Sequence, residues 1–344
     1  MTDATADVTY DAAEEFSGRQ TPLQRLQTVL HTYPWSSPLF VMLLAIVLFA
    51  FLSDGKTNTL ANLGTVTQQA SVIGTLAIGQ TLIILTAGID LSCAQIMVFA
   101  SMVMAKMSFD QGIPGGLAVV LAVIVAGLAG ALNGFLITKV KLPPFIVTLG
   151  TLGVFAGLKL IYATGRSIQY NELNKIHLWL GHQISIGNFR ITSGVLLMLV
   201  MYGVFAYVLR FTAWGTHVYA VGDDPDAARL AGINTNRVLL SVYVVAGVIF
   251  GIGGWLLIGR VQTAGPNVFE DGNLQSITAV VIGGTSLFGG RGRIIGSLIG
   301  ALIVAIVDNG LSVSGIDQAY KVILIGALII GAVSADQWIR KARV

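Results

Sequence analysis

Residues 115–138 read GGLAVVLAVIVAGLAGALNGFLIT, a run of 24 residues without Asp, Glu, Lys or Arg. An α-helix of about 20 apolar residues is long enough to cross the roughly 30 Å hydrocarbon core of a bilayer. A helix that is apolar on every side belongs in a membrane or in the centre of a large protein. This run therefore predicts a transmembrane helix, and the rest of the chain decides between the two settings.

The composition of the whole chain favours the membrane. Of the 344 residues, 54% are hydrophobic and only 11% are charged. Soluble proteins carry roughly 25% charged residues. So few charges cannot cover a water-exposed surface, which excludes an ordinary soluble enzyme, a disordered protein and a nucleic-acid binder. We predict an all-α, polytopic helical membrane protein.

Further apolar segments on both sides of this run predict about ten transmembrane helices. The segments cover residues 36–53, 66–87, 90–106, 115–138, 142–163, 191–211, 238–258, 275–288, 294–309 and 318–334, of which the eighth is short and glycine-rich. Ten crossings place both termini on the same side. With the N-terminus inside, 12 Lys and Arg residues flank the inner ends and 8 the outer ends, which predicts cytoplasmic termini.

Polar segments divide the chain into a tail and a transmembrane domain. Residues 1–35 form the predicted cytoplasmic tail, in which residues 21–31 have the pattern of a short interfacial amphipathic helix. Residues 36–344 form the transmembrane domain. Its two long loops are an outer loop at 164–190 and an inner loop at 212–237.

The sequence contains no motif of catalysis. Gly55-Lys56-Thr57 resembles the end of a phosphate-binding loop, but Ala50 stands where such a loop needs a glycine. Cys93 is the single cysteine, and His177 and His182 have no Cys or carboxylate at the spacing of metal ligands. GxSxG and HExxH motifs do not occur. We therefore expect a protein that is not an enzyme, with no catalytic residue, metal site or cofactor in this chain.

The inner loop carries the strongest functional signal. Asp224 and Pro225 suit a helix start, because Asp accepts hydrogen bonds from free N–H groups and Pro fits the first turn. Gly232 suits a left-handed helix end. The loop predicts a short amphipathic helix on the cytoplasmic face, made by Asp224, Pro225, Asp226, Ala227, Ala228 and Arg229 and ended by Gly232. Taken alone, such a helix serves equally well to tie two spans together.

Three stretches together resemble one family of transporters. Asp226-Ala227-Ala228 followed by Gly232 is similar to the EAA-and-glycine coupling helix of ABC importer permeases. Residues 85–92, LTAGIDLS, and residues 279–292, AVVIGGTSLFGGRG, resemble the GGIDLS turn and the most distinctive signature of the ribose, xylose, arabinose and galactose type of ABC sugar importer permease. Cys93-Ala94-Gln95 and Asn273-Leu274-Gln275-Ser276 depart from the family pattern.

The resemblance implies that the chain is one subunit of a transporter whose other subunits bind ATP and deliver the solute. The chain would be a multi-pass permease of the bacterial inner (plasma) membrane that pairs with a second copy. Two cytoplasmic ATPase subunits would bind ATP and Mg, and an external or periplasmic binding protein would deliver a neutral monosaccharide or polyol. ATPase closure would move residues 224–233 as a lever and switch the pathway by alternating access. Gly232→Asp is then expected to abolish sugar-stimulated ATP hydrolysis in a folded permease.

Two glycine-containing turns are candidate gates. The residues are Gly88, Asp90, Gly283, Gly284, Gly289 and Gly290. For Asp90, helix capping is the alternative to a gating charge. For Gly283-Gly284, a packing kink is the alternative to a kink that lines the pathway.

Polar residues within the spans are candidates for the pathway, because uncharged side chains suit a neutral polyol. They are Gln69, Gln80, Gln95, Asn133, Thr148, Gln275, Thr278 and Asn309. For any one of them, hydrogen bonding between helices is the alternative. No charged pair is expected at mid-membrane, which disfavours a charged substrate.

Three other functions remain open at this point. An ABC permease for nucleosides or branched-chain amino acids would share the architecture. An ion-coupled secondary transporter usually places ionisable residues deep in the membrane, whereas Asp90, Lys159 and Asp308 lie near predicted span ends. A membrane scaffold without transport activity is the third alternative.

Overall fold

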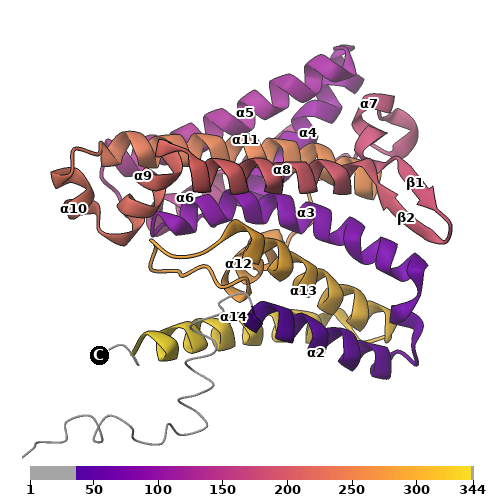
Figure 1. The fold of residues 1–344 in the computed structure, drawn as a ribbon. Helices are drawn as coiled ribbons and strands as arrows, with labels where there is room; N and C mark the ends of the chain where they lie inside the picture. Colours follow the sequence, from indigo (N-terminus) through magenta and orange to yellow (C-terminus); the bar gives the residue numbers. More distant parts are fainter. Residues whose placement is uncertain (1–35, 342–344) are drawn as a thin grey trace, which may run out of the picture.

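Residues 36–341, described by a computed structural model, form a bundle of helices (Figure 1). The predicted tail, with its helix at 21–31, lies outside the described residues, as do residues 342–344. The longer helices are α2 (Ser36–Leu52), α3 (Leu60–Leu85), α4 (Cys93–Gln111), α5 (Gly115–Thr138), α6 (Pro144–Ala163), α8 (Ser193–Phe211), α11 (Thr235–Val261), α12 (Gly272–Ile282), α13 (Ile294–Val313) and α14 (Gln318–Lys341). Each overlaps one apolar segment predicted from the sequence.

Several of these helices have the length and composition of membrane spans. Within the described part of the chain, six are long and apolar enough to cross a bilayer, namely α3, α5, α6, α8, α11 and α13. Two apolar helices are shorter, since α2 has 17 residues and α12 has 11. The chain is thus a helical membrane protein, as predicted.

The short elements gather at the two opposite ends of the bundle. The connection from α2 to α3 contains η1 (Lys56–Asn58). The region of the outer loop forms η2 (Tyr170–Glu172), α7 (Lys175–Leu178), η3 (Trp179–Gly181) and the antiparallel strands β1 (Gln183–Ile186) and β2 (Phe189–Thr192). The inner loop forms α9 (Ala213–Asp223) and α10 (Pro225–Leu230). We call these regions the hairpin end and the α10 end, at the right and left of Figure 1.

The centre of the bundle is formed by α3 and α11. Every residue of α3 from Ala70 to Leu85 is buried, and α11 packs against α3, α4 and α5. Glycines allow the close approach of α5 and α11, since a Cβ at Gly247 would stand 3.1 Å from the Cα of Gly130. Small residues one helical turn apart thus allow close helix packing at this contact.

Another GxxxG pair does not pack within the chain. Gly153 and Gly157 of α6 have no atom within 4 Å of the place where a Cβ would stand. The reason is that α6 lies at the edge of the bundle, where it packs mainly on α4 and α5. This pair therefore makes no close helix contact within the described residues.

The eighth predicted segment, 275–288, differs from the helix that forms there. Helix α12 begins at Gly272 and ends at Ile282, and Gly284 has a left-handed φ of 84°. Glycine adopts this conformation without steric cost, so the backbone leaves the helix although the sequence remains apolar. With 11 residues, α12 is about 16 Å long, half the thickness of the hydrocarbon core.

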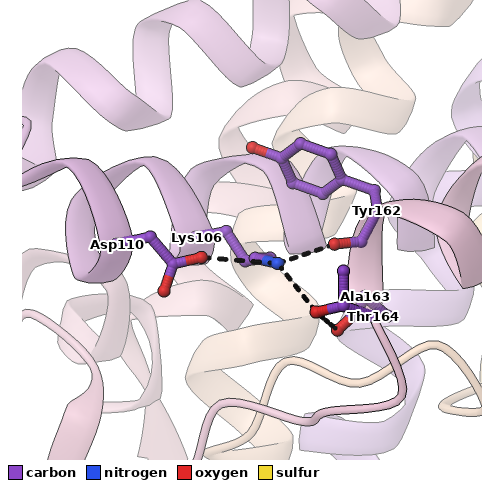
Figure 2. A network of polar contacts seen from close by, with 5 residues as sticks. All are labelled: Lys106, Asp110, Tyr162, Ala163 and Thr164. Carbon is purple, nitrogen blue, oxygen red and sulfur yellow. Dashed lines mark hydrogen bonds and ion pairs between the residues drawn. The ribbon is translucent and has the colours of Figure 1, made fainter.

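A polar network joins the ends of α4 and α6 at the hairpin end (Figure 2). The ammonium of Lys106 donates to the carbonyl oxygen of Tyr162 over 2.8 Å and to the hydroxyl of Thr164 over 3.3 Å. It also forms an ion pair with Asp110 at 3.3 Å. A cation at the last carbonyls of α6 interacts favourably with the helix dipole, so this contact stabilises the packing of α4 on α6, which run in the same direction.

Candidate functional site

The three stretches that resemble the permease family lie far apart in the sequence but meet at the α10 end. The backbone N–H of Gly290 donates to the carbonyl oxygen of Leu85 over 2.9 Å. Gly222 of α9 lies against both groups, where a Cβ would stand 2.7 Å from the Gly290 nitrogen. The stretches 85–92 and 279–292 form a common base with α9, and α10, which carries the remaining stretch, projects from this base (Figure 1).

The base includes a helix, α9, that was not predicted. The hydroxyl of Tyr219 donates to the carbonyl oxygen of Gly292 over 3.0 Å and so ties α9 to the loop between α12 and α13. Burial raises the pKa of Tyr219, against the opposite effect of nearby Arg293, so the phenol remains a donor at neutral pH. Gly215 and Val218 lie on the buried face at helical spacing, a signal that could have identified α9.

Helix α10 has the ends predicted from the sequence. The Asp224 carboxylate accepts hydrogen bonds from the N–H groups of Asp226 and Ala227, each over 2.9 Å, and Pro225 is the first helical residue. Gly232 has a φ of 86°, and the N–H of Ile233 donates to the carbonyl of Ala228 over 3.0 Å. This pairing is a Schellman end. Both ends are made by local contacts, so α10 holds its shape without a partner.

The outer surface of α10 presents charged and apolar side chains. Asp226 and Arg229 are exposed and form an ion pair at 3.0 Å. Leu230 is 92% exposed, whereas Ala228 is only 4% exposed and packs into the core. Leu230 was not among the predicted site residues. Because residues two apart lie on different sides of a helix, the inward position of Ala228 identifies Leu230 as outward-facing.

The turn Gly88-Ile89-Asp90, between α3 and α4, is buried rather than open. Asp90 is 1% exposed, and its carboxylate accepts from the backbone N–H of Ser92 over 2.7 Å and from the Ser92 hydroxyl over 2.6 Å. The Ser92 hydroxyl in turn accepts from the Asn133 amide over 3.0 Å. Asp90 thus stabilises the turn that begins α4, which fits the capping alternative.

The other candidate gate glycines shape the loop between α12 and α13. Gly283 follows α12 and packs against Gly296 of α13. Gly284, Gly289 and Gly290 all have left-handed φ values, of 84°, 81° and 68°. A Cβ at Gly290 would stand 2.7 Å from the Cα of Asp223. The glycines at 289 and 290 therefore belong to the base of α10.

Four of the predicted pathway residues form hydrogen bonds within the protein. Asn133 and Thr148 hold the buried turn, since Thr148 donates to the carbonyl of Ile89 over 2.9 Å. Thr278 donates to the carbonyl of Leu274 in its own helix over 2.6 Å, and the Asn309 side chain accepts from Asn62 over 2.8 Å. These side chains fit the alternative of structural hydrogen bonding.

The four predicted glutamines behave differently. The side-chain oxygens of Gln69, Gln80, Gln95 and Gln275 are buried and accept no hydrogen bond from the described residues. Of these four, Gln275 lines a cavity of about 330 Å³ between α3, α11, α12 and α13. The cavity wall also includes Ile73, Arg260, Glu270, Asp271 and Asp308.

The charged residues of the cavity wall lie toward the hairpin end. Arg260 is the second-last residue of α11, and Asp308 lies five residues before the end of α13. Ile73 lies farther from that end, since it is 12 residues before the end of α3, about 18 Å along the axis. The expectation that no charged pair lies at mid-membrane stays a prediction.

Comparisons with known proteins agree with the three motifs. A family model described as "Branched-chain amino acid transport system / permease component" matches residues 62–333. The fructose import permease protein FrcC of Rhizobium meliloti is 44% identical over 339 residues, which cover 98% of this chain and 94% of that protein. The ribose import permease protein RbsC of Bacillus subtilis is 35% identical, with 87% of this chain and 92% of that protein covered. No solved structure matches the chain significantly.

Proposed function

The chain belongs to the family of ABC importer permeases that is described for branched-chain amino acid transport systems, and we propose that within this family it translocates a neutral monosaccharide or polyol. The relatives named for fructose and ribose import support this substrate class. Fructose is the first candidate, because the fructose permease is 44% identical over nearly the whole chain.

The observation that carries this proposal is the position of α10 on its base. Helix α10 exposes Leu230 and the Asp226–Arg229 ion pair, so it offers a partner protein an apolar and a charged contact. The base connects α10 through Gly222 to the end of α3 and through Gly290 to the loop after α12. A push on α10 would therefore reach two helices that line the cavity, which is what an ATP-driven permease requires.

In the proposed mechanism, other subunits hydrolyse ATP and deliver the sugar. Two cytoplasmic ATPases bind ATP and Mg and dock on α10, and an external or periplasmic binding protein delivers the sugar at the hairpin end. A second copy of the permease completes the pathway. ATPase closure moves α10 and switches the access of the pathway from one side to the other.

The proposed topology is ten crossings of the bacterial inner membrane with both termini in the cytoplasm. The excess of Lys and Arg at the inner segments supports this orientation. The end of α14 also points toward the α10 end of the bundle in Figure 1. An even number of crossings is consistent with that arrangement.

Reconstitution of the complete transporter tests the proposed function. The permease, the ATPases and the binding protein encoded beside it are combined in liposomes, and uptake of radiolabelled fructose, ribose, leucine and adenosine is measured with and without ATP. We expect ATP-dependent accumulation of a sugar. Uptake of leucine or adenosine alone would support the other ABC permease alternatives instead.

The ionisable residues of the cavity are the observation that favours the alternative of an ion-coupled transporter. Arg260 and Asp308 line the cavity, and ionisable residues inside the bundle are typical of ion-coupled transporters. Liposomes with the permease alone and an imposed H⁺ or Na⁺ gradient separate the two mechanisms. Sugar uptake under these conditions would contradict the ATP-driven proposal.

A further inference from the structure

The cavity lies where a helix begins in the middle of the bundle. Helix α12 starts at Gly272 beside the cavity and runs for 11 residues toward the α10 end. The remaining depth is covered by the non-helical residues 262–271. Non-helical backbone at membrane depth is tolerated where it is buried in protein or lines a water-filled cavity. Binding sites of transporters are often formed by such interrupted helices.

The start of α12 is held in place from α4. The side-chain oxygen of Asn273 accepts a hydrogen bond from the backbone N–H of Ala94 over 2.8 Å and from the thiol of Cys93 over 3.3 Å. A Cβ at Gly272 would stand 3.0 Å from the Cβ of Ala94. The two stretches that depart from the family pattern therefore contact each other next to the cavity.

Gln275 supplies an unused hydrogen-bonding group to this cavity. It lies in the first turns of α12, is only 4% exposed, and lines the cavity wall. Its side-chain oxygen accepts no hydrogen bond from the described residues. A buried amide oxygen without a donor is unfavourable. A hydroxyl group of a bound solute is a donor that would satisfy it.

The charged residues of the wall suit a molecule with many hydroxyl groups. Arg260 presents only donors, whereas Glu270, Asp271 and Asp308 present acceptors when ionised. Each hydroxyl both donates and accepts, so adjacent hydroxyls can bind both kinds of group. Three carboxylates against one guanidinium disfavour an anionic solute such as a sugar phosphate. The volume of about 330 Å³ is within the range of small-molecule sites.

We propose that this cavity is the site inside the membrane where the permease holds its solute during transit, a neutral polyhydroxylated molecule bound by Gln275, Arg260 and Asp308. This inference rests on the proposed import function and adds the location and chemistry of the binding site. The coupling helix α10 and this site are separate, so each can be changed without the other.

Paired substitutions of buried polar residues test the proposal in the reconstituted transporter. Gln275→Leu removes the amide that lines the cavity, and Thr75→Val removes a buried hydroxyl that bonds within α3 and lies outside the cavity wall. We expect Gln275→Leu to raise the sugar concentration for half-maximal uptake about tenfold, with Thr75→Val within about twofold of the wild type. Equal effects of the two variants would overturn the proposal.

A labelling experiment keeps the test informative if Gln275→Leu fails to insert. Asn267 lines the cavity at an exposed position, and Ser185 is exposed on β1, far from the cavity wall. Asn267→Cys and Ser185→Cys are labelled with a membrane-impermeant thiol reagent in the complete transporter, and the buried Cys93 remains as the native thiol. Fructose should slow labelling at 267 about fivefold or more and leave 185 unchanged. Equal labelling with and without the sugar would contradict the proposal.

The outcomes also separate this inference from the proposed function. A wild-type transporter that accumulates none of the tested sugars means that the import function is wrong. A wild type that accumulates sugar, together with cavity variants that match their controls, means that only the location of the site is wrong.

Discussion

Gly232 has a backbone conformation that favours glycine, and the space beside its Cα is open. Its φ of 86° lies in the left-handed region, and no atom stands within 4 Å of the place of a Cβ. A side chain at this position therefore meets backbone strain but no neighbour in the chain. Asn and Asp tolerate this conformation better than other residues with a side chain. The position is suited to a test of partner contact that leaves the fold intact.

Gly232→Asp should abolish the stimulation of ATP hydrolysis by sugar. The substitution adds a negative charge at the surface offered to the ATPase, at a cost in folding of about 1 kcal/mol. We expect sugar-stimulated ATP hydrolysis to fall about tenfold or more, with near-normal insertion. Gly232→Asn, of similar size and without the charge, should retain most of the stimulation. Normal transport by the Asp variant would show that α10 is not the coupling element.

Leu230→Ser should weaken ATPase docking without changing stability. Leu230 is 92% exposed in the permease, so its removal should alter the free energy of unfolding by less than about 0.5 kcal/mol. Loss of a leucine side chain that becomes buried against a partner costs about 1.5–3 kcal/mol of binding. Co-purification of the ATPase measures the effect, with Ala213→Ser of α9 as the exposed control. An ATPase that binds both variants equally would exclude Leu230 from the interface.

At the scale of elements, helix ends made by local contacts were predictable and those made by tertiary contacts were not. Helix α10 was predicted with its cap and its glycine end, because both depend on residues within the helix or next to it. The boundaries of α12 were predicted incorrectly, because residues 283–288 remain apolar although they form a loop. That loop exists through contacts with α9 and α13, which lie far from it in the sequence.

The buried turn between α3 and α4 gives a prediction at this scale. Thr148→Val leaves the carbonyl of Ile89 without its side-chain donor, at a cost of about 1–3 kcal/mol in stability. Thr278→Val is the matched control, because its hydroxyl bonds only within α12. Thermal unfolding of the purified permease should show a lower midpoint for Thr148→Val than for Thr278→Val. Equal midpoints would mean that the turn does not depend on α6.

The approach of α12 and α13 gives a second prediction. A Cβ at Gly300 would collide with the carbonyl oxygen of Ala279, whereas a Cβ at Gly153 meets no atom. Gly300→Ala should therefore destabilise the permease by about 1–3 kcal/mol through overpacking, and Gly153→Ala should not. Thermal unfolding compares the two variants. A stable Gly300→Ala protein would show that the two helices can separate at little cost.

At the scale of the whole molecule, the class of protein could be predicted from the sequence, but the cavity inside the bundle could not. Composition and hydropathy predicted a helical membrane protein, because they reflect the solvent that surrounds the chain. The cavity depends on which helices lie side by side, and residues 73, 260, 275 and 308 come from four different helices. Of the eight predicted pathway residues, only Gln275 lines it. Glu270 and Asp271 were not predicted to line a cavity, since the path of the loop at 262–271 cannot be inferred from hydropathy.

ATP-driven sugar uptake that is coupled through α10 is the central property proposed for this permease. The most direct measurement is the uptake of radiolabelled fructose and ribose by liposomes that contain the permease, its ATPases and its binding protein, with wild-type and Gly232→Asp permease compared side by side. We predict that the wild type accumulates a sugar only with ATP and that the variant accumulates none. Sugar uptake by the permease without its ATPases, or equal uptake by both forms, would contradict this account.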